Sequence, residues 1–107
     1  MKDSENIIVK PTFEFALAII AYCEELESNK KFVVSNQLLK SGTSIGANVR
    51  EAQNAESKND FIHKFKIAAK EVEETIYWLE LCKQSPNYPD CSTLIYQIET
   101  IQKLLIR

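Results

Sequence analysis

The chain has 107 residues, a length that suits one domain over residues 1–107 with a modest core. Its formal net charge of −2 gives no overall attraction to nucleic acids or anionic membranes, so such binding would require a local group of basic side chains. No segment approaches the ~18 consecutive apolar residues of a membrane span, and residues 1–10 lack the apolar centre of a signal peptide.

The cysteines at positions Cys23, Cys82 and Cys91 are odd in number, and no two of them form a Cys-x-x-Cys pair. They lie among apolar residues, which is typical of buried free thiols and not of a disulfide framework or a zinc site. Together with the missing signal sequence, this pattern predicts a cytoplasmic protein without a membrane partner.

The first predicted helix covers residues 12–28, with Thr12 as its cap. Its apolar residues form two stripes: Phe13, Ala16, Leu17, Ile20 and Cys23 in one, and Phe15, Ile19, Tyr22 and Leu26 in the other. A helix of a small bundle needs only one such face, so the second face predicts a contact with another subunit. We assign Phe15, Ile19 and Tyr22 to this oligomer interface.

The second predicted helix covers residues 30–55 and contains both glycines of the chain, Gly42 and Gly46. They are four residues apart and therefore share a face of the helix. A glycine within a helix costs about 0.5–1 kcal/mol relative to alanine, so two of them indicate a close approach by another backbone. The core-facing residues of this helix are expected to be Val34, Leu38, Ile45, Val49 and Ala52.

A stripe of polar residues runs beside that core face, with alternating spacings of four and three. It consists of Gln37, Ser41, Ser44, Asn48 and Glu51. Such spacing favours a seam between helices that hydrogen bonds fix in register, and the alternative is a solvated face. The predicted helix-packing residues are Ser41, Gly42, Ser44, Gly46, Asn48 and Glu51.

The third predicted helix covers residues 58–84, with Ser57 and Asp60 forming its capping signal. Its core seam is expected to contain Phe61, Phe65, Ala68, Val72, Thr75, Leu79 and Cys82. Further apolar residues near its end exceed what one seam needs, so we assign Tyr77, Trp78 and Leu81 to an oligomer interface. The alternative for Trp78 is a large core residue.

A segment with two prolines, residues 85–89, ends the third helix, and Asp90 is expected to cap a fourth helix over residues 90–106. The inward-facing residues of this last helix are expected to be Leu94, Ile95, Ile98, Ile101 and Leu105. Short connections place neighbouring helices antiparallel. The sequence therefore predicts an all-α fold, an antiparallel up-down-up-down four-helix bundle.

The sequence contains no recognisable catalytic arrangement. His63 is the single histidine and is expected to face solvent, so no catalytic triad is predicted. The Glu-x-x-His pairs of di-iron bundles are missing, as is a glycine-rich phosphate loop. We therefore expect no enzyme activity, no metal, no cofactor and no small-molecule substrate.

Lysines are concentrated in the first half of the third helix, where a symmetric assembly would multiply them into a ring. They are Lys58, Lys64, Lys66 and Lys70. Surface lysines suffice to contact phosphates, so these four are candidates for RNA or DNA binding. The alternative is an ordinary surface, because Glu56, Asp60 and Glu71 dilute the positive charge.

Four stretches of the sequence resemble one known family. They are QLLKSGTSIGANVREA (residues 37–52), SKNDF (57–61), AAKEVEET (68–75) and YWL (77–79). The chain is similar, over about residues 12–105, to the bacterial four-helix bundle proteins encoded within 23S ribosomal RNA intervening sequences. That family is similar in turn to the accessory protein of diversity-generating retroelements, a basic pentamer that binds nucleic acid and a reverse transcriptase.

The resemblance implies a homo-oligomer, with a pentamer favoured, and no known catalytic activity. Ser44, Asn48, Glu51, Ser57, Asp60 and Phe61 match motif positions for which it implies structural roles. Two functions follow as hypotheses: a non-enzymatic oligomeric scaffold or adaptor, and, as the alternative, a nucleic-acid-binding module. The slight acidity of this chain differs from the basic retroelement relative.

Overall fold

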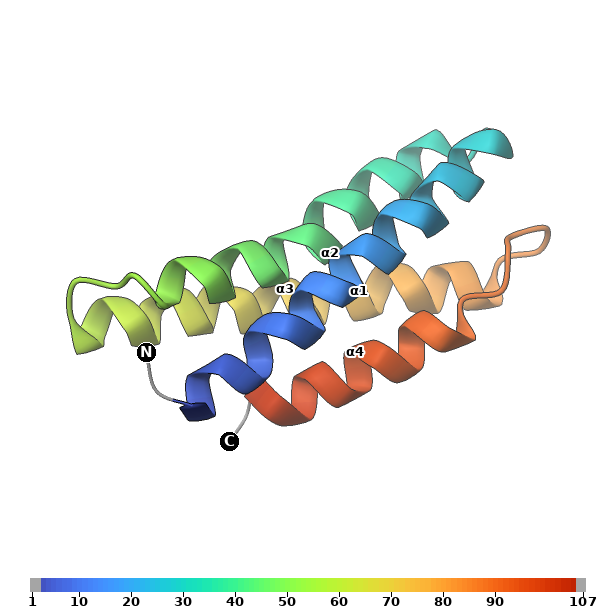
Figure 1. The fold of residues 1–107 in the computed structure, drawn as a ribbon. Helices are drawn as coiled ribbons and strands as arrows, with labels where there is room; N and C mark the ends of the chain where they lie inside the picture. The colour runs from blue at the N-terminus through green and yellow to red at the C-terminus, as the bar shows by residue number, and fades with distance from the viewer. Residues whose placement is uncertain (1–2, 106–107) are drawn as a thin grey trace.

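The computed structural model describes residues 3–105, and the side chains of residues 7–105, as four helices (Figure 1). They are α1 (Asp3–Ser28), α2 (Phe32–Ala52), α3 (Lys58–Gln84) and α4 (Ser92–Leu105). These described residues include no β-strand, so the predicted all-helical class is confirmed, and the arrangement fits a four-helix bundle.

Helices α1 and α3 each pack against both α2 and α4. Within the described residues, no Cα atoms of α1 and α3 come within 8 Å of each other, so these two helices occupy diagonal positions. Figure 1 shows α2 and α3 joined by the short turn at one end of the molecule, and α3 and α4 joined at the other end. The outer faces of α1 and α3 therefore lie on different sides of the subunit.

The start of α1 differs from the prediction, because the helix begins at Asp3 and contains Pro11 in its interior. A proline within a helix costs ~3 kcal/mol. The turn before it recovers part of this cost by burying Ile8, which joins the core. Thr12 is therefore not a cap: its buried hydroxyl donates to the carbonyl of Ile8 at 2.8 Å.

The core is formed by one apolar stripe from each helix. Its fully buried side chains include Phe15, Ile19, Leu26, Leu38, Ile45, Val49, Val72, Leu79, Ile98 and Ile101. The core face predicted for α2 is confirmed, with Val34 at its partly buried edge. In α3, Ala68, Val72, Thr75, Leu79 and Cys82 are buried as predicted, and Phe61 and Phe65 stack on each other at 4.7 Å in half-buried positions.

The ends of α2 lie inside the predicted range of residues 30–55. Lys30 has a φ of 63°, which places it in the left-handed region and ends the turn after α1 before α2 can begin. At the other end, the amides of Asn54 and Ala55 bond to carbonyls three residues before them, in tight turns that follow Ala52. The helix is therefore shorter than its apolar periodicity suggested.

The predicted bounds of α3 are confirmed, whereas those of α4 are not. Helix α4 begins at Ser92, so Asp90 does not act as its cap but accepts a hydrogen bond from the Ser92 hydroxyl at 2.8 Å. Asn87 has a φ of 67° and turns the chain between the two prolines of this connection. The predicted last residue of α4, position 106, lies outside the described residues.

Candidate interaction surfaces

The two glycines of α2 set the distance between α2 and α1. A Cβ atom on Gly46 would lie 3.1 Å from the carbonyl oxygen of Thr12, and one on Gly42 would lie 2.9 Å from a side-chain carbon of Ile19. At Gly46 the neighbour is therefore backbone, which is the close approach that the sequence indicated. At Gly42 the neighbour is a buried side chain of the core.

The interface prediction for α1 is wrong, because the three assigned residues are buried within the subunit's own core. Phe15 and Ile19 have no exposed surface, and Tyr22 is 7% exposed, with its hydroxyl donating to the carbonyl of Pro89 at 2.7 Å. All three side chains belong to the core, and Ile19 lies against Gly42 of α2. They are consequently unavailable to a second subunit.

The opposite stripe of α1 lines an apolar groove of about 350 Å³ together with α2. We name this the α1–α2 groove; its main lining residues are Phe13, Ala16, Leu17, Ile20, Gly46 and Ala47. Phe13 is 49% exposed, Leu17 is 54% exposed and Ile20 is 40% exposed. Arg50 also lines the groove and holds its guanidinium 5.2 Å from the centre of the Phe13 ring.

A second apolar surface lies near the end of α3. We name Tyr77, Trp78 and Leu81 the α3 patch; Tyr77 is 58% exposed, Leu81 is 37% exposed, and Trp78 is half-buried against the core. The two aromatic rings meet edge to face at 5.3 Å. The indole of Trp78 donates to the carboxylate of Glu74 at 3.3 Å.

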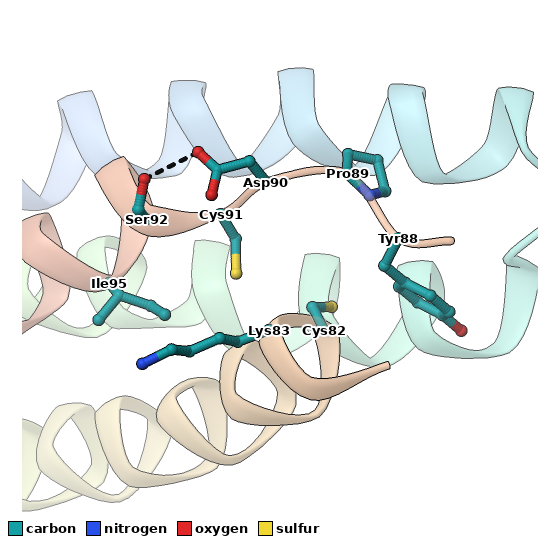
Figure 2. A pocket seen from close by; sticks show the side chains of 8 residues that line it. All are labelled: Cys82, Lys83, Tyr88, Pro89, Asp90, Cys91, Ser92 and Ile95. Carbon is teal, nitrogen blue, oxygen red and sulfur yellow. Dashed lines mark hydrogen bonds between the residues drawn. The ribbon is translucent and has the colours of Figure 1, made fainter. Parts of the chain in front are cut away.

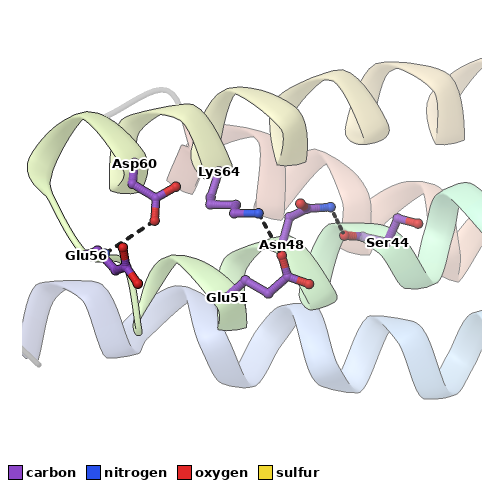
Figure 3. Close-up of polar contacts among 6 residues, drawn as sticks. All are labelled: Ser44, Asn48, Glu51, Glu56, Asp60 and Lys64. Carbon is purple, nitrogen blue, oxygen red and sulfur yellow. Dashed lines mark hydrogen bonds and ion pairs between the residues drawn. The ribbon is translucent and has the colours of Figure 1, made fainter.

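The polar stripe of α2 connects to α3 at only two points. The Ser41 and Thr75 hydroxyls form a buried hydrogen bond at 2.9 Å, and Glu51 pairs with Lys64 at 3.0 Å (Figure 3). By contrast, the Asn48 amide donates to the carbonyl of Ser44 within α2. Ser44 likewise bonds within its own helix, and Gln37 is exposed. The predicted seam is therefore real at two positions and a partly solvated face at the others.

The four candidate nucleic-acid-binding lysines do not form one uniform group. Lys58, Lys66 and Lys70 are exposed, whereas Lys64 is paired with Glu51, whose hydrogen bond and negative charge raise the pKa of the lysine. His63 is exposed beside them, as expected. Three of the four lysines are thus accessible to a phosphate.

A second pocket, of about 370 Å³, lies where α3 and α4 are joined, and Figure 2 shows Cys82 and Cys91 on its walls. Both thiols are buried, and burial is the main cause that raises the pKa of each. The reactive thiolate is thereby disfavoured. Among the described residues, no three side chains of His, Cys, Asp or Glu are grouped to hold a metal ion.

Comparison with known proteins identifies the family of this chain. The family model for the 23S rRNA-intervening sequence protein matches residues 4–107. The chain belongs to this family. A similar solved structure is a crystal structure of a protein with unknown function from the S23 ribosomal protein family of Bacteroides thetaiotaomicron. It is 42% identical with a TM-score of 0.90, over 96% of this chain and 95% of that one. No curated protein matches the sequence.

In this member of the 23S rRNA-intervening sequence protein family, the motif residues around the α2–α3 turn have identifiable structural roles. Ser57 caps α3 by accepting a hydrogen bond from the Asp60 amide at 3.0 Å, as predicted. The Asp60 carboxylate accepts a hydrogen bond from the amide of Glu56 at 3.3 Å (Figure 3).

Among the described helices, none combines the length and the hydropathy that a membrane-spanning helix requires.

Proposed function

We propose that the protein is a non-enzymatic, homo-oligomeric helical scaffold or adaptor. The observation that carries this proposal is the α1–α2 groove, where three large apolar side chains are each at least 40% exposed on one helix face. Single exposed apolar residues are normal, but contiguous apolar surfaces mark sites of protein interaction. Covering this groove would remove apolar area from water at about 25 cal/mol per Å².

In the proposed assembly each subunit is an antiparallel up-down-up-down bundle, an arrangement that the short connections between helices support. Five subunits is the number that the family resemblance implies. We also propose a cytoplasmic location, which the three buried free cysteines support, because disulfides seldom form in a reducing compartment.

The mass of the protein in solution tests this proposal. We expect light scattering coupled to size exclusion to give a multiple of the 12.3 kDa subunit mass at micromolar concentration. Leu17→Glu places a charge in the groove and should reduce the mass toward one subunit. The matched control is Tyr96→Glu, at a 72% exposed aromatic residue of α4 outside the groove and the α3 patch. A monomeric parent protein would refute the scaffold proposal.

A second candidate function is binding of RNA or DNA, which the exposed side chains of Lys58, Lys66 and Lys70 and the name of the family support. A ring of subunits would repeat these lysines despite the net charge of −2. A salt titration of binding to structured RNA tests it, with Lys66→Glu/Lys70→Glu as the variant. Affinity should fall steeply with salt in the parent and be weaker in the variant; no affinity at low salt would eliminate this function.

A further inference from the structure

We propose that subunits join head to tail, with the α3 patch of one copy seated in the α1–α2 groove of the next. The inference rests on the proposed homo-oligomer and specifies which two surfaces meet. It differs from a two-fold contact, in which a groove would meet a groove or a patch would meet a patch.

The positions of the two surfaces suit such a contact. Helices α1 and α3 are diagonal in the bundle and do not contact each other, so the groove beside α1 and the patch on α3 do not cover each other within one subunit. A subunit that has two different apolar surfaces can bind one neighbouring subunit with each of them. Repetition of that contact forms a ring when the rotation between copies closes.

The shapes of the two surfaces are also complementary. The groove is lined by small residues, Ala16, Gly46 and Ala47, together with the larger side chains of α1. The α3 patch instead presents large side chains, of which Tyr77 is the most exposed. Anchor residues of protein interfaces are typically aromatic side chains that enter apolar pockets, and Tyr77 could enter this groove in that way.

The charges beside the two surfaces are opposite. Arg50 lies in the groove and Glu74 lies next to the patch, one helical turn before Trp78. Within residues 7–105 the one ion pair joins Lys64 and Glu51, so among these residues neither Arg50 nor Glu74 pairs with an oppositely charged side chain. In a head-to-tail contact these two charges can pair, whereas a groove-to-groove contact would bring two arginines together.

Mixing two blocked variants tests the pairing of surfaces. Leu17→Glu blocks the groove and leaves the patch intact, while Tyr77→Glu does the reverse. Each variant alone should sediment as a monomer, because neither can supply both halves of a contact. Their mixture should form a one-to-one heterodimer that grows no further, because only one intact groove meets one intact patch. A concentration series by sedimentation velocity detects the doubled mass.

The controls separate this inference from the proposed function. Circular dichroism should show the parent helix content in both variants, since the replaced side chains are more than half exposed, and Tyr96→Glu should keep the parent mass. A monomeric parent would end the scaffold proposal itself. If the parent is oligomeric but Tyr77→Glu keeps its mass, or the mixture stays monomeric throughout the series, the head-to-tail contact is wrong.

A charge exchange gives a second test without blocking either surface. Arg50→Glu alone and Glu74→Arg alone should each lower the oligomer mass at a fixed concentration, because like charges would then meet. The combined variant should restore it, since every contact again joins opposite charges. Failure of the combined variant to recover more mass than either single one would overturn the pairing of these residues.

Discussion

The contacts of α2 with its two neighbours are built on different principles. Against α1, α2 presents glycines, and a Cβ atom added at Gly46 would lie 3.1 Å from the carbonyl oxygen of Thr12. Against α3, α2 uses a buried hydroxyl pair, Ser41 and Thr75, and a surface ion pair. The α1–α2 contact leaves no room for a larger side chain, whereas the α2–α3 contact requires each buried hydroxyl to keep its hydrogen-bond partner. The two contacts should therefore respond differently to substitution.

The difference also explains why α1 has an exposed apolar stripe. Gly42 and Gly46 let α2 lie close to α1. The small residues where these two helices meet therefore line a groove and leave it open. A close backbone approach therefore produces both tight packing inside and an uncovered surface outside.

The largest effect is expected from placing a large side chain at the contact between α1 and α2. Gly46→Leu should destabilise the protein by more than the ~1–3 kcal/mol typical of an overpacked core, because the obstacle is backbone and cannot change rotamer. Denaturant unfolding would measure the loss. The matched control is Gln37→Leu, at an exposed position of the same helix outside the α1–α2 groove, where we expect a much smaller change. Equal stabilities of the two variants would show that α1 does not restrict Gly46.

A smaller effect is expected from the polar contact. Thr75→Val keeps the shape of the side chain but removes the buried bond to Ser41, and should cost about 1–3 kcal/mol. Adding Ser41→Ala should cost less in that background than in the parent, because no partner is then left unsatisfied. Thr43→Val is the control, since the Thr43 hydroxyl bonds only within α2. Strictly additive losses would mean that the Ser41–Thr75 pair is not coupled.

Much of this architecture could be predicted from the sequence. The spacing of apolar residues located all four helices, and the capping signal at Ser57 placed the start of α3 correctly. The start of α1 was missed because proline usually marks a helix boundary, while here the burial of Ile8 extends the helix through Pro11. Rules based on local sequence do not include the stabilisation that comes from burying Ile8 in the tertiary structure.

The candidate site shows where sequence periodicity stops being informative. Phe15 and Ile19 are four residues apart, as are Phe13 and Leu17, so both stripes of α1 fit a helix face equally well. The choice between them depends on where α2 approaches, and that approach is visible only from the contacts of Gly42 and Gly46. The surplus of apolar surface was therefore predictable, whereas the face that carries it was not.

The effect that is smallest at neutral pH concerns a thiol where α1 meets α2. Cys23 is buried and donates to the Ser35 carbonyl at 3.5 Å, and burial is the main cause that raises its pKa to about 11. In an unfolded chain the thiol ionises near a pKa of about 8.5. Between these two values the unfolded chain loses this proton while the folded protein keeps it, so alkaline pH stabilises the unfolded state.

The stability of the protein should therefore fall as the pH rises from about 8.5 toward 11, by at most about 1.4 kcal/mol per pH unit from this group. Cys23→Ala removes this contribution, and its curve of unfolding free energy against pH should be flatter than that of the parent in this window. Cys82 and Cys91, whose pKa values are also raised, remain in both proteins, so the difference between the curves isolates Cys23. Parallel curves would mean that the thiol is hydrated in the folded state, and the junction of α1 and α2 would then be looser at Cys23 than at Gly46.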